Sequence, residues 1–168
     1  HPDVFFTRGE AWVYQQVERC DPQLFDRIRR HVEAGRWEIV GGWYLQPDCN
    51  APSGFAFRRQ IDLGKQYFRA RFGRFPQIAM NPDSFGHAAT LPGLMHAAGQ
   101  NAYIYMRPQE SENPLRQRVF RWRGYADGPE VTAFHRRAMQ VYTEFGFDNI
   151  ALNIALRPDK RIGSEEVW

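Results

Sequence analysis

The sequence predicts an α/β fold in which parallel strands alternate with helices. Three observations support this prediction. Short apolar runs typical of buried strands alternate with amphipathic helical stretches, glycines follow several of the helical stretches, and the connections are short. Strands that are joined through a helix run parallel, with a right-handed crossover. Either an open sheet or a (β/α) barrel satisfies this pattern, and in both the functional site lies at the carboxyl ends of the strands.

Helix start and stop signals place the elements before residue 107. Asp21 and Pro22 form a typical helix start, and Gly35 is a typical helix end. Ser53 caps a long helix, which Gly73 ends in the same way. The expected strands are residues 4–7, 37–40, 77–80 and 102–106, and the expected helices are residues 10–19, 22–34, 54–72 and 90–98.

The pattern changes after Met106. Residues 120–123 and 131–134 flank Asp127 and Gly128, a combination that predicts an antiparallel hairpin with its turn. The residues that follow the hairpin carry the weakest pattern in the chain.

Composition places the chain among soluble globular proteins. Its 168 residues are 43% hydrophobic and 24% charged, which suffices for a buried core. The net charge of +3 is small and scattered, and no apolar run approaches a membrane span, so neither nucleic acid nor membrane is an expected partner. Two cysteines exclude a disulfide framework and a cysteine-rich zinc site. The low cysteine content and the lack of a glycosylation sequon favour a cytoplasmic location.

Asp83 is the strongest catalytic candidate. It lies just after a predicted strand, between Pro82, which stiffens the approach, and Gly86, which permits a sharp turn. A carboxylate at this place could act as a nucleophile, a general base or a metal ligand. A turn or helix-capping aspartate is the simpler interpretation, and the residues alone favour it over a functional role.

A second polar loop, residues 43–52, follows the strand at 37–40, and we expect it to share a cleft with the loop at 81–89. Trp43 and Asp48 combine an aromatic face with a carboxylate, a pairing that suits a sugar, although the aromatics of such a loop also cover cores. Cys49 is interpreted as a small buried hydrophobe rather than a nucleophile. His87 is a possible ligand because it lies in the cleft loop.

Together these segments resemble the N-terminal catalytic domain of glycoside hydrolase family 38, the α-mannosidases. The resemblance covers the chain from His1 to Phe134, and the Asp-x-Phe-Gly-His element at 83–87 is its most specific part. The matching pieces are residues 12–14, 21–25, 35–38, 41–43, 47–50, 52–54, 59–60, 82–87 and 91–92.

The resemblance implies a family 38 (β/α) barrel, incomplete in this chain, and zinc-dependent retaining hydrolysis of α-mannosides or mannose-containing oligosaccharides. It makes residues 1–134 part of the catalytic domain and residues 135–168 a poorly matched continuation. Asp83 is then both catalytic nucleophile and zinc ligand. The implied substrate-binding residues are Trp43, Asp48, Asn50, Phe85 and His87.

The chain also departs from the family pattern. The zinc-binding His-x-Asp pair, the later zinc-binding histidine and the acid/base aspartate cannot be assigned, and Phe55 stands where many relatives carry glutamate. The chain opens with His1 rather than methionine, so we expect a fragment that is inactive alone and forms homo-oligomers through unpaired sheet edges. The alternatives are a non-catalytic carbohydrate-binding or interaction module, and a metal-dependent polysaccharide deacetylase.

Overall fold

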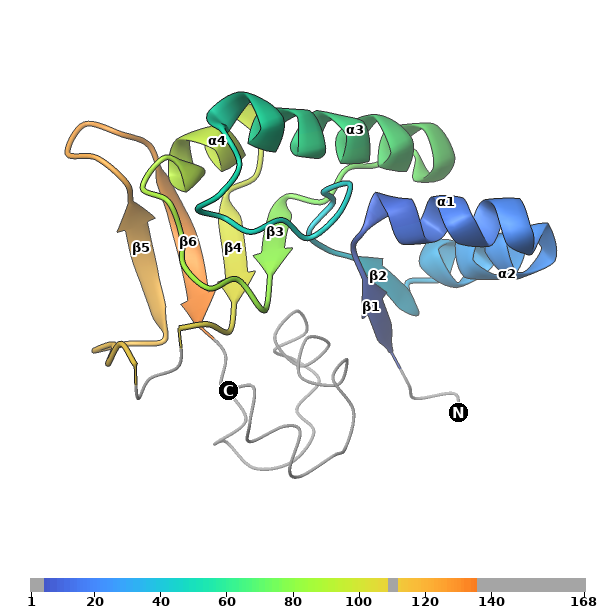
Figure 1. The fold of residues 1–168 in the computed structure, drawn as a ribbon. Helices are drawn as coiled ribbons and strands as arrows, with labels where there is room; N and C mark the ends of the chain where they lie inside the picture. Colours follow the sequence, from blue (N-terminus) through green and yellow to red (C-terminus); the bar gives the residue numbers. More distant parts are fainter. Residues whose placement is uncertain (1–4, 109–111, 136–168) are drawn as a thin grey trace.

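The computed structural model describes residues 5–108 and 112–135, which form helices and strands in alternation (Figure 1). The helices are α1 (Ala11–Cys20), α2 (Pro22–Glu33), α3 (Gly54–Phe72) and α4 (Leu91–Ala98). The strands are β1 (Phe6–Arg8), β2 (Trp37–Ile39), β3 (Ile78–Asn81), β4 (Ala102–Tyr105), β5 (Val119–Arg123) and β6 (Glu130–His135). The predicted α/β class is therefore confirmed.

The strands form two sheets. β1 and β2 pair in parallel, and a second sheet has the order β3-β4-β6-β5, in which β5 alone is antiparallel to its neighbour (Figure 1). A hydrogen bond of 2.8 Å from the Gly41 N–H to the Ile78 carbonyl links the end of β2 to the start of β3. Within residues 5–108 and 112–135 both sheets are open and do not close into a barrel.

The predicted hairpin is present, but its second strand has an additional role. β5 and β6 pair antiparallel around the turn at Asp127 and Gly128. β6 also pairs in parallel with β4, so that the hairpin extends the parallel sheet instead of standing apart from it. β6 is hydrogen-bonded along both edges, and the burial of its alternate residues shows that one of its faces packs on the core.

Local capping chemistry sets the helix boundaries. The Asp21 carboxylate accepts the Leu24 N–H at 2.9 Å, and the Ser53 hydroxyl oxygen accepts the Ala56 N–H at 3.2 Å. Gly73 ends α3 with a φ of 68°, a conformation that favours glycine. These three predicted signals are confirmed. The strand expected at 77–80 is shifted by one residue, because Asn81 pairs with Tyr105 of β4.

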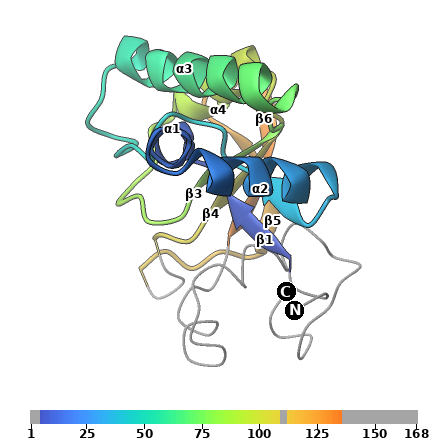
Figure 2. The same ribbon diagram turned by 90° about the vertical axis from the view of Figure 1, so that its right-hand side faces the viewer.

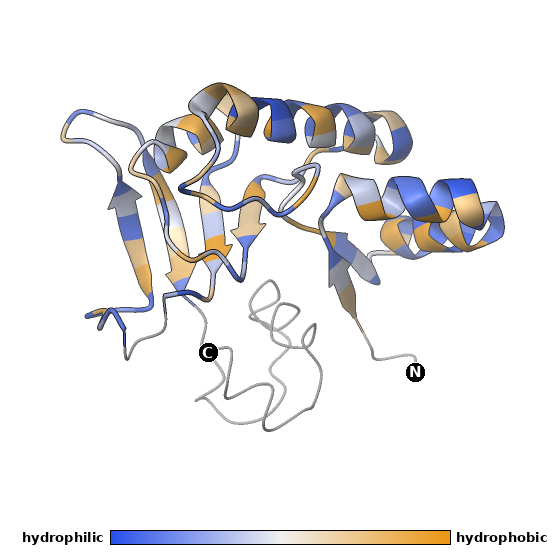
Figure 3. Ribbon diagram, in the orientation of Figure 1, coloured by the Kyte–Doolittle hydropathy of each residue, from blue (hydrophilic) through white to orange (hydrophobic). Residues whose placement is uncertain are grey.

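The helix α3 joins two hydrophobic clusters. Figures 1 and 2 show the helices lying together, with α3 packed on α1 and on α4. Phe57 and Ile61 of α3 pack with β3, β4 and α4, whereas Phe68 packs with α1, α2 and β2. Figure 3 shows apolar and polar residues sharing the same helices, as this two-sided role requires. No helix in the described ranges has the length and apolarity needed to cross a membrane.

Gln100 connects segments that are distant in the sequence. Its buried side-chain oxygen accepts the Trp43 indole N–H at 2.8 Å. Its side-chain nitrogen donates to the carbonyls of Gly41 at 2.7 Å and Pro76 at 3.2 Å. The residue just after α4 is thereby tied both to the loop that follows β2 and to the segment that precedes β3.

Gly64 marks the closest approach of α3 to the loop that follows β2. A Cβ atom at this position would lie 2.0 Å from the Gly42 carbonyl oxygen, a backbone atom that cannot move aside on its own. Gly93 in α4 provides a contrast, because a Cβ atom there would meet nothing within 4 Å.

We therefore predict opposite effects of alanine at the two helical glycines. Gly64→Ala should lower the free energy of unfolding by about 2–3 kcal/mol, because helix and loop must separate. Gly93→Ala should raise it by up to about 1 kcal/mol through improved helix propensity. Urea unfolding followed by far-UV circular dichroism measures both. Equal effects of the two substitutions would show that α3 does not pack closely on the loop.

Candidate active site

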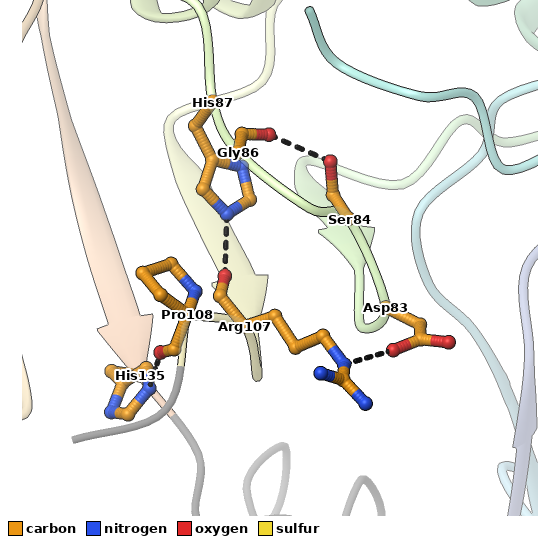
Figure 4. A network of polar contacts seen from close by, with 7 residues as sticks. All are labelled: Asp83, Ser84, Gly86, His87, Arg107, Pro108 and His135. Atoms are coloured by element: carbon orange, nitrogen blue, oxygen red, sulfur yellow. Dashed lines mark hydrogen bonds and ion pairs between the residues drawn. The ribbon is translucent and has the colours of Figure 1, made fainter. Parts of the chain in front are cut away.

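Asp83 and Arg107 meet at the carboxyl ends of two neighbouring strands. Asp83 follows β3 and Arg107 follows β4, and these strands are paired in parallel as far as Asn81 and Tyr105. The Arg107 Nε–H donates to the Asp83 Oδ1 at 2.5 Å (Figure 4). The Asp83 side chain is 60% exposed. The site therefore has a solvent-accessible carboxylate that is oriented by a guanidinium group.

Phe85 adds an aromatic surface beside this ion pair. Its side chain is 74% exposed, and the Arg107 guanidinium carbon lies 4.9 Å from the centre of its ring. An exposed aromatic ring beside a carboxylate offers a flat surface on which the C–H groups of a ligand can pack. The arrangement offers one charged and one aromatic contact on the same loop.

His87 is engaged at both ring nitrogens. Its Nε2 lies 2.6 Å from the Arg107 carbonyl oxygen, and its Nδ1 lies 3.0 Å from the Tyr103 hydroxyl (Figure 4 shows the first contact). Burial lowers the pKa of His87, because the charged imidazolium loses hydration there. His87 therefore contacts protein at each position where it could bind a metal or a sugar hydroxyl.

Buried polar bonds join the loop at 43–52 to the loop at 81–89. The Asn81 amide nitrogen donates to the Pro47 carbonyl at 2.7 Å and to the Cys49 Sγ at 2.9 Å. The Cys49 N–H donates to the Ser84 hydroxyl oxygen at 3.3 Å, and Cys49 also forms a parallel bridge with His87. The two loops thus lie side by side, and the cleft that they are expected to share stays a prediction.

The route of the first loop differs from the expectation. The loop does not simply begin at the edge where β3 and β4 end. It leaves β2 beside Ile78, at the start of β3, and reaches Ser84 only at Cys49. Gly86 completes the contact between the loops, since a Cβ atom there would lie 2.1 Å from the Asn50 amide nitrogen and its φ is 148°.

The structure does not bring all of the sequence-predicted residues together at the surface. Trp43 is 2% exposed, and its indole packs on Phe57 and Tyr103, with ring centres 5.0 and 6.2 Å away. Its ring is part of the core and offers no open face to a sugar. The Asp48 carboxylate is exposed and caps a turn, accepting the Asn50 N–H at 2.8 Å and the Ala51 N–H at 3.3 Å.

Sequence reasoning missed three residues of this site. Arg107 directly follows a predicted strand, so the strand-end argument that selects Asp83 also applies to it. His135 directly follows the predicted strand at 131–134, so the same argument applies to it. Tyr103 gave no comparable signal, because it lies inside a strand and its hydrogen bond partner is distant in the sequence.

The described residues do not by themselves fit a zinc ion. No three histidine, cysteine, aspartate or glutamate side chains within residues 5–108 and 112–135 are grouped so as to hold a metal. Asp83 is the predicted ligand among them, and its Oδ1 already accepts the Arg107 guanidinium. A zinc site that includes Asp83 needs ligands from elsewhere.

Comparison with known proteins gives two signals. Residues 1–152 match the family described as "Glycosyl hydrolases family 38 N-terminal domain". The α-mannosidase G of Dictyostelium discoideum is 30% identical over 80% of this chain, which spans 12% of that relative. The crystal structure of an α-mannosidase from Enterococcus faecalis V583 matches 78% of this chain and 15% of its own, with 21% identity and a TM-score of 0.68, and so shares the fold.

The second signal concerns a different class of enzyme. The threonine–tRNA ligase of Xylella fastidiosa (strain M12) is 67% identical over 99% of this chain and 27% of the ligase. An alignment of that extent reaches beyond residue 152, where the family 38 match ends. The two signals therefore overlap over nearly all of residues 1–152, and only the ligase match extends past residue 152.

We predict that only one of the two cysteines reacts in the folded protein. Cys20 is exposed, whereas Cys49 is buried and burial raises the pKa of its thiol, which leaves little thiolate. A disulfide-exchange reagent should modify Cys20 rapidly and Cys49 only after unfolding in urea. Mass spectrometry of the labelled peptides measures this difference. Comparable labelling of both peptides under native conditions would contradict the buried position of Cys49.

Proposed function

The chain belongs to glycosyl hydrolase family 38, and we propose that it carries the nucleophile of an enzyme that hydrolyses terminal α-mannosides with retention of configuration. The observation that best supports the proposal is the exposed Asp83 carboxylate at a strand end, oriented by Arg107 beside the exposed Phe85 ring. The chain spans 12% of the relative named above, so the activity is proposed for a larger enzyme.

Asp83 would attack the anomeric carbon of a terminal mannose. The carbon–oxygen bond to the leaving alcohol breaks as the carboxylate forms a glycosyl ester, and water later hydrolyses that ester. Arg107 donates to Oδ1, so we assign the attack to Oδ2. A second carboxyl group must protonate the leaving oxygen, and we assign it to a part of the enzyme outside the described residues.

Phe85 and Asn50 are the substrate contacts that the surface geometry favours. The exposed Phe85 ring can pack against the C–H groups of a sugar, and the exposed Asn50 amide lies over Gly86 of the same loop. Asp48 can bind a hydroxyl through the lone pairs that its turn leaves free. Trp43 supports this loop from the core.

We propose zinc as a cofactor of the larger enzyme, with Asp83 as one ligand. Zinc bound there would hold sugar hydroxyls and help to position the mannose ring. The described residues offer no complete ligand set, so the remaining zinc ligands would come from elsewhere in the enzyme.

The domain arrangement follows from the same proposal. Residues 1–134 would form part of a (β/α) barrel, and the strands that close it would come from elsewhere in the enzyme. We expect the 168-residue chain alone to be inactive towards mannosides, because it lacks an assigned acid/base residue and most zinc ligands. The unpaired edges of the sheets would then favour homo-oligomers.

The threonine–tRNA ligase match supports a second candidate, activation of threonine with ATP. Threonine-dependent exchange of pyrophosphate into ATP distinguishes this candidate directly. The family match, the α-mannosidase relative, the shared fold and the exposed Asp83 together favour the glycosidase. A non-catalytic mannose-binding module would bind mannose without zinc and show no turnover.

Asp83→Asn should abolish turnover in the natural enzyme that carries this sequence. Loss of a nucleophilic carboxylate removes the covalent pathway, and we expect kcat for an aryl α-mannoside to fall by at least about 10³-fold. Asp62→Asn is the control, since Asp62 forms an exposed ion pair with Arg58 on α3 and should leave kcat unchanged. Turnover that survives Asp83→Asn would assign the nucleophile to another residue.

A further inference from the structure

We propose that His87 and His135 are positioning residues, which clamp the main chain at Arg107 and Pro108 so that the Arg107 side chain meets Asp83. The role assigned to Asp83 rests on the proposed function, whereas the clamp itself rests on geometry. His87 would then position the main chain at Arg107, instead of contacting the sugar as the family resemblance implies.

The two histidines reach the clamped segment from opposite sides. The His87 Nε2 lies 2.6 Å from the Arg107 carbonyl oxygen, and the His135 Nε2 lies 2.8 Å from the Pro108 carbonyl oxygen (Figure 4). His87 follows β3 and His135 ends β6, and these strands flank β4 on either side. Two consecutive carbonyls after β4 are therefore held by its two neighbours.

The acceptors fix the protonation of both rings. A carbonyl oxygen only accepts, so each Nε2 must carry a hydrogen. The Nδ1 of a neutral His87 then accepts the Tyr103 hydroxyl hydrogen, at 3.0 Å. The Arg107 carbonyl thus selects the Nε2–H tautomer of His87, and the hydroxyl of Tyr103, which is fully buried on β4, completes the contacts of the ring.

The clamp has a direct consequence for Asp83. An arginine side chain has many rotamers, and the contact that it makes is weakened further when its main chain is mobile. Here the main chain is held by the hydrogen bonds from the two histidines to its carbonyls, and the Phe85 ring further confines the guanidinium. The bond from Arg107 to Asp83 thus ends a chain of contacts that runs from Tyr103 through His87.

The first test uses the 168-residue chain and needs no activity. Long-range proton–nitrogen NMR spectra report the tautomer of each histidine ring. We expect the Nε2–H form at His87 and at His135. An Nδ1–H tautomer at either ring would overturn the proposal, because that ring could not donate to its carbonyl.

The second test compares two substitutions that differ in the atom they retain. The amide nitrogen of His87→Gln can reach the place of Nε2 and keep the bond to the Arg107 carbonyl. The amide group of His87→Asn reaches only the place of Nδ1 and loses that bond. The Arg107 Nε–H resonance should stay protected from solvent exchange in the wild type and in His87→Gln, and lose protection in His87→Asn. Equal protection in both variants would overturn the proposal.

The third test measures kinetics in the natural enzyme that carries this sequence. His87→Asn should lower kcat by about 10²-fold with KM nearly unchanged, the result of a nucleophile misplaced by about 1 Å. His87→Gln should restore most of the rate, and the exposed His31→Asn is the control. A kcat loss shared equally by the glutamine and asparagine variants would contradict a positioning role.

A double substitution shows whether His87 affects kcat through Arg107 or independently of it. If His87 acts through Arg107, adding His87→Asn to Arg107→Met should lower kcat no further than Arg107→Met alone. Additive losses would overturn the proposal. A wild-type enzyme that does not cleave mannosides would refute the proposed function, and the two NMR tests would still decide whether the clamp exists.

Discussion

The side chain of Gln100 holds together the part of the fold on which the site depends. Burial of an amide is costly unless its hydrogen bonds are made, and Gln100 makes three, to Trp43, Gly41 and Pro76. These bonds fix the chain after β2 against the start of β3. The loop that follows can then run along β3 and deliver Cys49 to Ser84, close to Asp83.

The edge where the site lies is built from parallel pairing and buried polar bonds. Pairing of β3 with β4 sets Asn81 opposite Tyr105, and so starts the two following loops at the same level. Asn81 then binds Pro47 and Cys49 below the surface. Because these hydrogen bonds are buried and directional, they hold in place the loop that carries the exposed Asp83 carboxylate and Phe85 ring.

Structural features that depend on contacts within a few residues, such as helix boundaries, could be predicted from the sequence. Features that depend on partners distant in the sequence could not. Asp21, Ser53 and Gly73 work through bonds to their own helices. The role of Trp43 could not be decided from the residues alone, because the sequence does not show whether a loop tryptophan covers the core or binds a sugar. The insertion of β6 between β4 and β5 depends on which strand the hairpin meets in space.

The pairing of a nucleophile with a cation raises an energetic question, since ester formation removes the charge of Asp83 and leaves Arg107 alone. An interaction lost in the transition state would slow the reaction. Arg107 is 38% exposed, and ion pairs at that exposure are worth about 0–1 kcal/mol, so little is lost. Correct placement of the carboxylate, at about 10²-fold in rate, corresponds to about 2.7 kcal/mol. Orientation therefore outweighs the lost attraction, and a clamped, partly hydrated arginine suits this role better than a buried one.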